Sequence, residues 1–187
     1  MFKRILGGLR ERKKARHDAF SKSPIRLILG IGNPGEQHQN TYHNAGLLYL
    51  DYLSGGCKNE FKQYRSFAFC KKGGLALVKS RVPMNRSGEA VRQAMKYFNL
   101  KSGEVLVAHD DSDIQLGNYK IVFDRGSAGH KGIESIITHL GNRAFWRLRI
   151  GIRKTGGKAN DFVLSKMSSG DLATLRGLFS KVEIPNP

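Results

Sequence analysis

From residue 25 onward, short apolar runs alternate with segments in which apolar residues recur every three or four positions. Apolar runs of strand length lie at residues 25–32, on either side of Gly73-Gly74, and at 104–111, 118–124 and 145–152. Helical periods lie at 43–56, 87–100, 130–141 and 168–182. The pattern predicts an α/β fold, in which one mostly parallel sheet is flanked by helices in a three-layer sandwich. The strand pair joined at Gly73-Gly74 makes the sheet mixed.

Two of the helical segments also predict which side chains face the core. The apolar side of the first comprises Ala45, Leu47, Leu48 and Tyr52. The second is expected to have its N-cap near Ser87, with Ala90, Val91, Ala94, Met95 and Phe98 facing inward. Because no internal repeat is visible and 187 residues suit a single core, we expect one domain over residues 25–187.

Residues 1–24 form a basic N-terminal extension that differs in composition from the rest. Its apolar residues follow the i, i+3, i+4, i+7 spacing of a helix, at Phe2, Ile5, Leu6 and Leu9. A basic amphipathic helix is typical of a mitochondrial presequence, although two acids and Gly7-Gly8 count against one. The alternative is a disordered arm that adds affinity for RNA phosphates. We expect a mitochondrial location, or otherwise a cytoplasmic one.

The net charge of +17 is unusually high for a chain of this length. Residues 1–22 hold eight Lys or Arg and two acids, which leaves +11 on the rest of the chain. A basic body indicates a nucleic-acid partner, with dispersed solubilising charge as the alternative. Since no apolar run approaches about 20 residues, we expect no membrane partner. Nothing in the sequence demands more than a monomer.

The cysteines and the glycine-rich loop are the two candidate cofactor or metal motifs of the chain. Cys57 and Cys70 are too few and too far apart for a zinc knuckle or a redox pair, so we expect reduced thiols in an intracellular protein. The stretch GIGNPG at 30–35 matches the dinucleotide fingerprint G-x-G-x-x-G. However, Pro34 delays the next helix to about residues 41–43, and the nearest later acid, Asp51, falls inside that helix. We therefore expect neither a nucleotide cofactor nor a metal.

The same loop leaves the carboxyl end of the first strand, where open α/β sheets place their ligands. Asn33 and His43 would line this crevice, AHDD would bring Asp110 to it, and PMNRSG would bring Asn85. Such a set suits hydrolysis by water, with His43 as base, Asp110 orienting it, and an amide N–H holding the oxyanion. Taken alone, each of these residues is more often a helix cap, part of a turn or the end of a strand. The predicted function therefore depends on the four side chains lying together in one crevice.

Ordered motifs across residues 25–167 resemble those of the bacterial-type peptidyl-tRNA hydrolases. The matching stretches are LILGIGNPGEQHQNTYHNAG, PMNRSG, VAHDDSDIQLG, GHKG and FWRLRIGIRK. The resemblance implies a single α/β domain that cleaves the ester between a peptide and the 3′ ribose of tRNA, with His43, Asp110, Asn33 and Asn85 as catalytic residues. It implies that tRNA is the partner, with substrate contacts at Met84, His38, Lys131, Lys120 and Arg149.

Four positions depart from the family pattern. Tyr42 stands where the family has Arg, and His38 where it has Tyr, and both retain hydrogen-bonding capacity. Lys131 replaces the Asn of the family motif GHNG, and Val122 replaces a frequent phosphate-binding Lys, for which Lys120 is a substitute. These changes leave open an alternative: an RNA-binding relative, of the organellar intron-splicing type, that kept the fold and lost hydrolysis. Retention of all four catalytic candidates argues against it.

Overall fold

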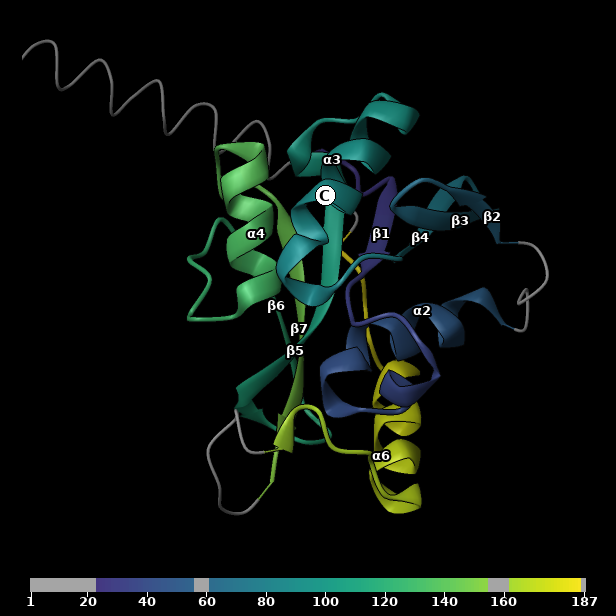
Figure 1. Cartoon of the computed structure of the whole chain (residues 1–187), viewed down its shortest axis with the longest axis vertical. Coiled ribbons are helices and arrows are strands. Elements are labelled where there is room, and N and C mark those ends of the chain that lie inside the picture. The colour runs from purple at the N-terminus through teal and green to yellow at the C-terminus, as the bar shows by residue number, and fades with distance from the viewer. Residues whose placement is uncertain (1–22, 56–60, 155–161, 186–187) are drawn as a thin grey trace, which may run out of the picture.

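The computed structural model describes residues 23–55, 61–154 and 162–185, which form a seven-stranded sheet covered by helices (Figure 1). The strands are β1 (Leu27–Gly30), β2 (Lys62–Tyr64), β3 (Phe67–Lys72), β4 (Leu75–Ser80), β5 (Val105–Gln115), β6 (Tyr119–Phe123) and β7 (Trp146–Arg153). The helices are α2 (Ala45–Ser54), α3 (Ser87–Phe98), α4 (Lys131–Leu140) and α6 (Ser169–Phe179), with short 3₁₀ turns η1 (Glu36–His38), η2 (Tyr42–Asn44), η4 (Met84–Arg86) and η5 (Ser102–Glu104). None of the helices in these ranges is long and apolar enough to cross a membrane.

The strand order is β2-β3-β4-β1-β5-β7-β6, and the central four strands are parallel. The outer pairs β2-β3, β3-β4 and β6-β7 are antiparallel. Gly30 at the end of β1 lies in register with Ala108 of β5. The loop that follows β1 and the last residues of β5 therefore meet at the carboxyl edge of the sheet. This is the edge at which open α/β sheets bind their ligands.

Each face of the sheet carries its own hydrophobic core. On one face, Val105 and Val107 of β5 belong to a cluster with residues of α3 and α4, which lie side by side in Figure 1. On the other face, Leu106 and Ala108 belong to a cluster with residues of α2 and α6. This alternation along one strand confirms the predicted three-layer α/β architecture and its mixed sheet.

Three details differ from the sequence prediction. Strand β2 was missed because its sequence KQY is short, polar and mostly exposed at the sheet edge. Tyr52 was predicted to face the core but is 42% exposed, whereas Tyr49 is buried at 1%. The N-cap of α3 lies near Ser87 as expected but is the preceding residue, Arg86, and the Ser87 hydroxyl instead donates to the Met84 carbonyl at 2.7 Å.

The start of α2 is seated against the sheet by a contact between two glycines. A Cβ on Gly46 would lie 2.2 Å from the Ala108 carbonyl oxygen, and a Cβ on Gly30 would lie 2.4 Å from the Gly46 carbonyl oxygen. Such a close backbone approach excludes any side chain at either position. It fixes α2, and the turn η2 just before it, over the ends of β1 and β5.

We expect Gly46→Ala to lower the free energy of unfolding by about 1–3 kcal/mol, because the new methyl group overpacks a backbone contact. Urea denaturation measures this change. The matched control is Gly177→Ala in α6, where a Cβ would meet nothing within 4 Å. That control is expected to stabilise by up to about 1 kcal/mol through helix propensity. Equal stability of Gly46→Ala and wild type would contradict the assigned seating of α2.

Candidate active site

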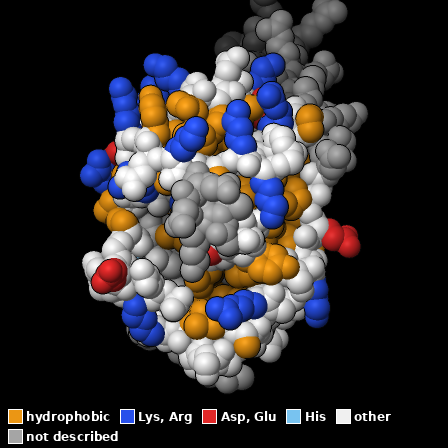
Figure 2. Space-filling view, turned by 90° about the vertical axis from the view of Figure 1, so that its right-hand side faces the viewer, with side chains coloured by type: hydrophobic (Ala, Val, Ile, Leu, Met, Phe, Trp, Pro, Cys, Tyr) orange, Lys and Arg blue, Asp and Glu red, His pale blue; other side chains and the backbone are white. Residues whose placement is uncertain are grey.

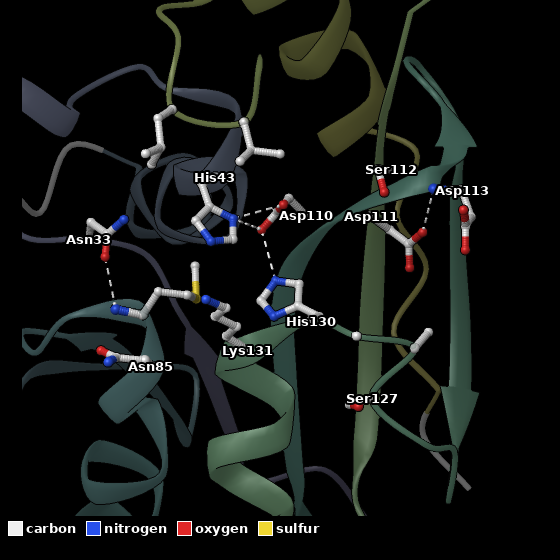
Figure 3. A pocket seen from close by; sticks show the side chains of 15 residues that line it. Asn33, His43, Asn85, Asp110, Asp111, Ser112, Asp113, Ser127, His130 and Lys131 are labelled. Atoms are coloured by element: carbon white, nitrogen blue, oxygen red, sulfur yellow. Dashed lines mark hydrogen bonds and ion pairs between the residues drawn. The ribbon is translucent and has the colours of Figure 1, made fainter. Parts of the chain in front are cut away.

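A cavity of about 700 Å³ opens at the carboxyl edge of the sheet. The loop after β1, the turns η2 and η4, the end of β5, the start of α4 and residues 163–164 all contribute to its wall (Figure 3). The wall includes all four residues predicted to be catalytic: Asn33, His43, Asn85 and Asp110. The predicted meeting of the first crossover with a distant strand end is therefore observed.

His43 and Asp110 form a hydrogen-bonded pair in this wall. His43 Nδ1 lies 2.9 Å from both carboxylate oxygens of Asp110, as Figure 3 shows. Because an ionised carboxylate only accepts hydrogen bonds, Nδ1 carries the proton and donates it. Nε2 of the neutral ring is then left with a lone pair on the cavity side. This is the arrangement that a general base requires.

The turn that carries His43 is held from two sides. The His43 backbone N–H donates to the Val163 carbonyl at 2.8 Å. The neighbouring Tyr42 hydroxyl donates to the Asp171 carboxylate of α6 at 2.5 Å, and Lys154 also bonds this carboxylate at 2.9 Å. These bonds outweigh desolvation and lower the pKa of Asp171, so the anchor stays ionised. Tyr42 thus helps to position the turn that carries His43, a role that the sequence alone did not reveal.

A second imidazole, which the sequence patterns did not predict, contacts Asp110 and belongs to His130. His130 Nε2 lies 3.0 Å from Asp110 Oδ1. Its Nδ1 accepts from the N–H groups of Gly132 at 3.1 Å and Ile133 at 3.3 Å, so this ring is the N-cap of α4. Because Nδ1 accepts, Nε2 must be the donor to Asp110. The signal in the sequence that could have indicated this cap is the position of His130 at the start of the helical apolar pattern of residues 130–141.

Asp110 is buried at 3% exposure, yet it stays ionised. Burial alone would raise its pKa, but the electrostatic attraction of the His130 ring and the hydrogen bonds from His130 and His43 outweigh burial and hold the pKa well below its usual range. His109 lies behind this group, with its ring 4.7 Å from that of His130. Burial, followed by the electrostatic effect of the neighbouring His130 ring, lowers the pKa of His109, so His109 is neutral at pH 7.

His43, Asp110 and His130 are also the one group in the described ranges whose potential metal-ligand atoms lie within 4.8 Å of one another. A metal ion at His130 Nε2 would displace the proton on that atom and move it to Nδ1. Nδ1 already accepts two backbone N–H groups, so protonation there would break the cap of α4. The hydrogen bonds therefore favour an Asp110 carboxylate that accepts from two imidazole N–H groups, rather than a metal ion bound by the same three residues.

The two predicted amides differ in how firmly they are held. Asn33 Oδ1 accepts from the Met84 backbone N–H at 2.8 Å. Two bonds between Asn44 and the Asn33 backbone, at 2.8 and 3.0 Å, fix the loop itself. The Asn33 Nδ2 group is then the part of the amide available as a donor. Asn85 is exposed and lines the cavity without a comparable restraint.

The predicted substrate-binding residues divide into two groups. Met84 and Lys131 line the cavity, whereas His38, Lys120 and Arg149 do not. Arg149 of β7 lies in register with Lys120 of β6. Its Nε donates to the Asp111 carboxylate at 2.6 Å, an ion pair that the sequence analysis did not foresee. A basic pair therefore lies beside the cavity, with one member partly neutralised.

Comparison with known proteins places this geometry in a family. The family model described as peptidyl-tRNA hydrolase matches residues 27–184. The peptidyl-tRNA hydrolase of Ruthia magnifica is 38% identical over 160 residues, covering 81% of this chain and 84% of that protein. That of Neisseria meningitidis serogroup C (strain FAM18) is 37% identical over 153 residues, covering 78% and 80%.

A solved structure agrees with these sequence matches. The crystal structure of peptidyl-tRNA hydrolase from Acinetobacter baumannii superposes with a TM-score of 0.74 at 30% identity and covers 83% of each chain. Family match, relatives and fold are thus in agreement over most of the described residues, and the chain belongs to the peptidyl-tRNA hydrolase family.

Proposed function

We propose that this protein hydrolyses the ester bond between a peptide, or another N-blocked aminoacyl group, and the 3′ ribose of tRNA. One observation carries the proposal beyond family membership. His43 is held by Asp110 in the tautomer that leaves Nε2 free, and it faces an open cavity. Water is the only other reactant that ester hydrolysis needs, so we propose that no cofactor takes part.

In the proposed reaction, His43 Nε2 removes a proton from a water molecule as its oxygen attacks the ester carbonyl carbon. The resulting imidazolium is stabilised by the Asp110 carboxylate and then protonates the departing ribose oxygen. The products are a peptide carboxylic acid and tRNA with a free 3′ hydroxyl. General base catalysis of this kind contributes about 10²- to 10⁴-fold in rate.

The amides complete the site by binding the reacting carbonyl. As the carbonyl oxygen becomes an oxyanion, the Nδ2 groups of Asn33 and Asn85 are suited to donate to it. The restraint on Asn33 described above preorganises its donor, which is what makes such a donor effective. One oxyanion donor is worth about 10²- to 10³-fold in kcat.

Positive charge outside the cavity supports tRNA as the partner. Figure 2 shows Lys and Arg side chains spread over one face of the molecule, with few acids among them. Lys120 and Arg149 are the proposed phosphate contacts, with the protein acting as a monomer. The alternative, an RNA-binding relative without hydrolysis, has no support from the family model or from the relatives named above, which are described as peptidyl-tRNA hydrolases.

Incubation with N-acetylaminoacyl-tRNA beside free aminoacyl-tRNA tests the proposal. We expect release of tRNA from the blocked form and little from the free form. His43→Ala should lower the rate by at least about 10²-fold, because the base is lost, while tRNA affinity measured by filter binding stays within about twofold. Hydrolysis by His43→Ala at the wild-type rate would reject the assigned base.

The Arg149–Asp111 ion pair predicts opposite effects of two substitutions on tRNA affinity. Arg149→Ala should weaken binding and reduce the slope of log affinity against log salt by about 0.7–0.9, the contribution of one phosphate contact. Asp111→Asn should strengthen binding, because it removes an anion that competes for the same guanidinium.

Repeating Arg149→Ala in the Asp111→Asn background separates the lost contact from the repulsion of an unpaired Asp111. Arg176→Ala is the matched control, because it removes one cation from the exposed side of α6 and should leave the salt slope unchanged. Unchanged salt slopes in both backgrounds would remove Arg149 from the tRNA interface.

A mitochondrial location is proposed from the N-terminal pattern alone, since residues 1–22 lie outside the described residues. Import would remove a presequence, so protein isolated from mitochondria should have a lower mass than the full chain. Intact-mass spectrometry measures this directly. Full-length protein from that compartment would favour the alternative of a basic RNA-binding arm.

A further inference from the structure

Lys131 places a cation without a partner in the wall of the cavity. It is the first residue of α4 and is exposed. Figure 3 shows its side chain pointing from the start of the helix into the cavity, on the side where His43 and Asn33 lie. Among residues 23–55, 61–154 and 162–185, no acceptor lies within hydrogen-bond or ion-pair distance of its ammonium group.

Every acid that lines the same cavity is already paired with another group. Asp110 accepts from two imidazoles. Asp111 pairs with Arg149 at 2.6 Å, and Asp113 pairs with Arg153 at 3.3 Å. None of these acids pairs with the Lys131 ammonium, which is therefore left without an anionic partner among the described residues and can bind a group of the substrate.

Helix stability does not explain a lysine at this position. The first turn of a helix carries partial positive charge, so a cation there is unfavourable for the helix. The attachment point is nonetheless rigid. A Cβ on the next residue, Gly132, would lie 2.5 Å from Met84 Sδ and 2.8 Å from Ile31 Cδ1, so the first turn of α4 is packed tightly against η4 and the start of the loop after β1.

We infer that the Lys131 ammonium stabilises the oxyanion formed on the ester carbonyl, an inference that rests on the proposed function. Water attacks the carbonyl carbon, His43 takes the water proton, and the carbonyl π electrons move to oxygen, where Lys131 and the amides face the new charge. When the tetrahedral intermediate collapses, the ribose oxygen leaves with the proton from His43. Lys131 itself keeps all its protons throughout.

The alternative counterpart is a phosphate of the tRNA 3′ end. The base and the oxyanion donors must converge on one carbon atom, so a cation directed toward the base is directed toward the reacting carbonyl as well. Arg149 and Lys120, which lie outside the cavity, are better placed for the phosphate backbone. The two roles predict different kinetics, because oxyanion binding affects kcat whereas ground-state phosphate binding affects KM.

Two substrates distinguish these roles. One is N-acetylaminoacyl-tRNA, and the other is the ester of an N-acetylated amino acid with the 3′ hydroxyl of adenosine, which carries no phosphate. Lys131→Met keeps the length of the side chain and removes its charge. We expect it to lower kcat for the tRNA substrate about 10- to 100-fold with KM changed by less than about threefold, and to lower kcat/KM for the adenosine ester by a similar factor.

Lys131→Arg should retain more activity than Lys131→Met, because it keeps the charge. Lys181→Met, which removes an exposed cation just beyond α6, is the matched control and should behave as wild type. Circular dichroism checks that each variant is folded. A raised KM and a reduced salt slope on tRNA, with no effect on the adenosine ester, would overturn the inference in favour of phosphate binding.

Wild-type rates for Lys131→Met on both substrates would also overturn the inference, while leaving the proposed function intact. If the wild-type protein cleaved neither the tRNA substrate nor the adenosine ester, the proposed function itself would be rejected.

Discussion

The buried carboxylate of Asp110 is the group on which the rest of the site depends. Taking an isolated carboxylate out of water costs several kcal/mol unless it is paired and hydrogen-bonded. Here two imidazole N–H groups, from His43 and His130, meet that requirement at 2.9 and 3.0 Å. The same bonds settle where each ring carries its proton. One charge therefore fixes both the direction and the tautomer of the proposed base.

The fold provides this arrangement through backbone contacts far from the chemistry. Parallel pairing of β1 with β5 brings the first crossover beside Asp110. The contact of Gly30 with Gly46 lets α2 and η2 approach the sheet closely, and this approach brings His43 within hydrogen-bond distance of Asp110. On the other side, His130 serves both as N-cap of α4 and as donor to Asp110, so the helix start and the carboxylate are positioned by one ring.

The sequence predicted the alternation of strands and helices because buried runs and helical periods are local patterns. It also predicted the meeting of His43 with Asp110, because parallel strands present their carboxyl ends at one edge. It could not predict the pair of Arg149 with Asp111, which depends on the register of β5 and β7. Nor could it assign His130, whose role follows from a cap and a tertiary contact together. Strand β2 was missed because its three residues are polar and mostly exposed, so they carry no buried pattern.

Lys131 shows how a departure from the family pattern acquires meaning only in three dimensions. In the sequence it is one substitution in a short motif. In the structure it is the first residue of a rigid helix start, in a cavity whose acids are all paired with other groups. Our inference about Lys131 therefore depends on its direction toward His43 and on its lack of a partner among the described residues, rather than on similarity of side chains.

Long-range ¹H–¹⁵N correlation NMR of the histidine rings tests the central claim most directly, because it reports which nitrogen of each neutral imidazole carries the proton. The account predicts that His43 is protonated on Nδ1, with a bare Nε2, and that His130 is protonated on Nε2. Asp110→Asn should disturb both assignments. A neutral His43 protonated on Nε2 in the wild-type protein would contradict the account, because that nitrogen could not then accept a proton from water.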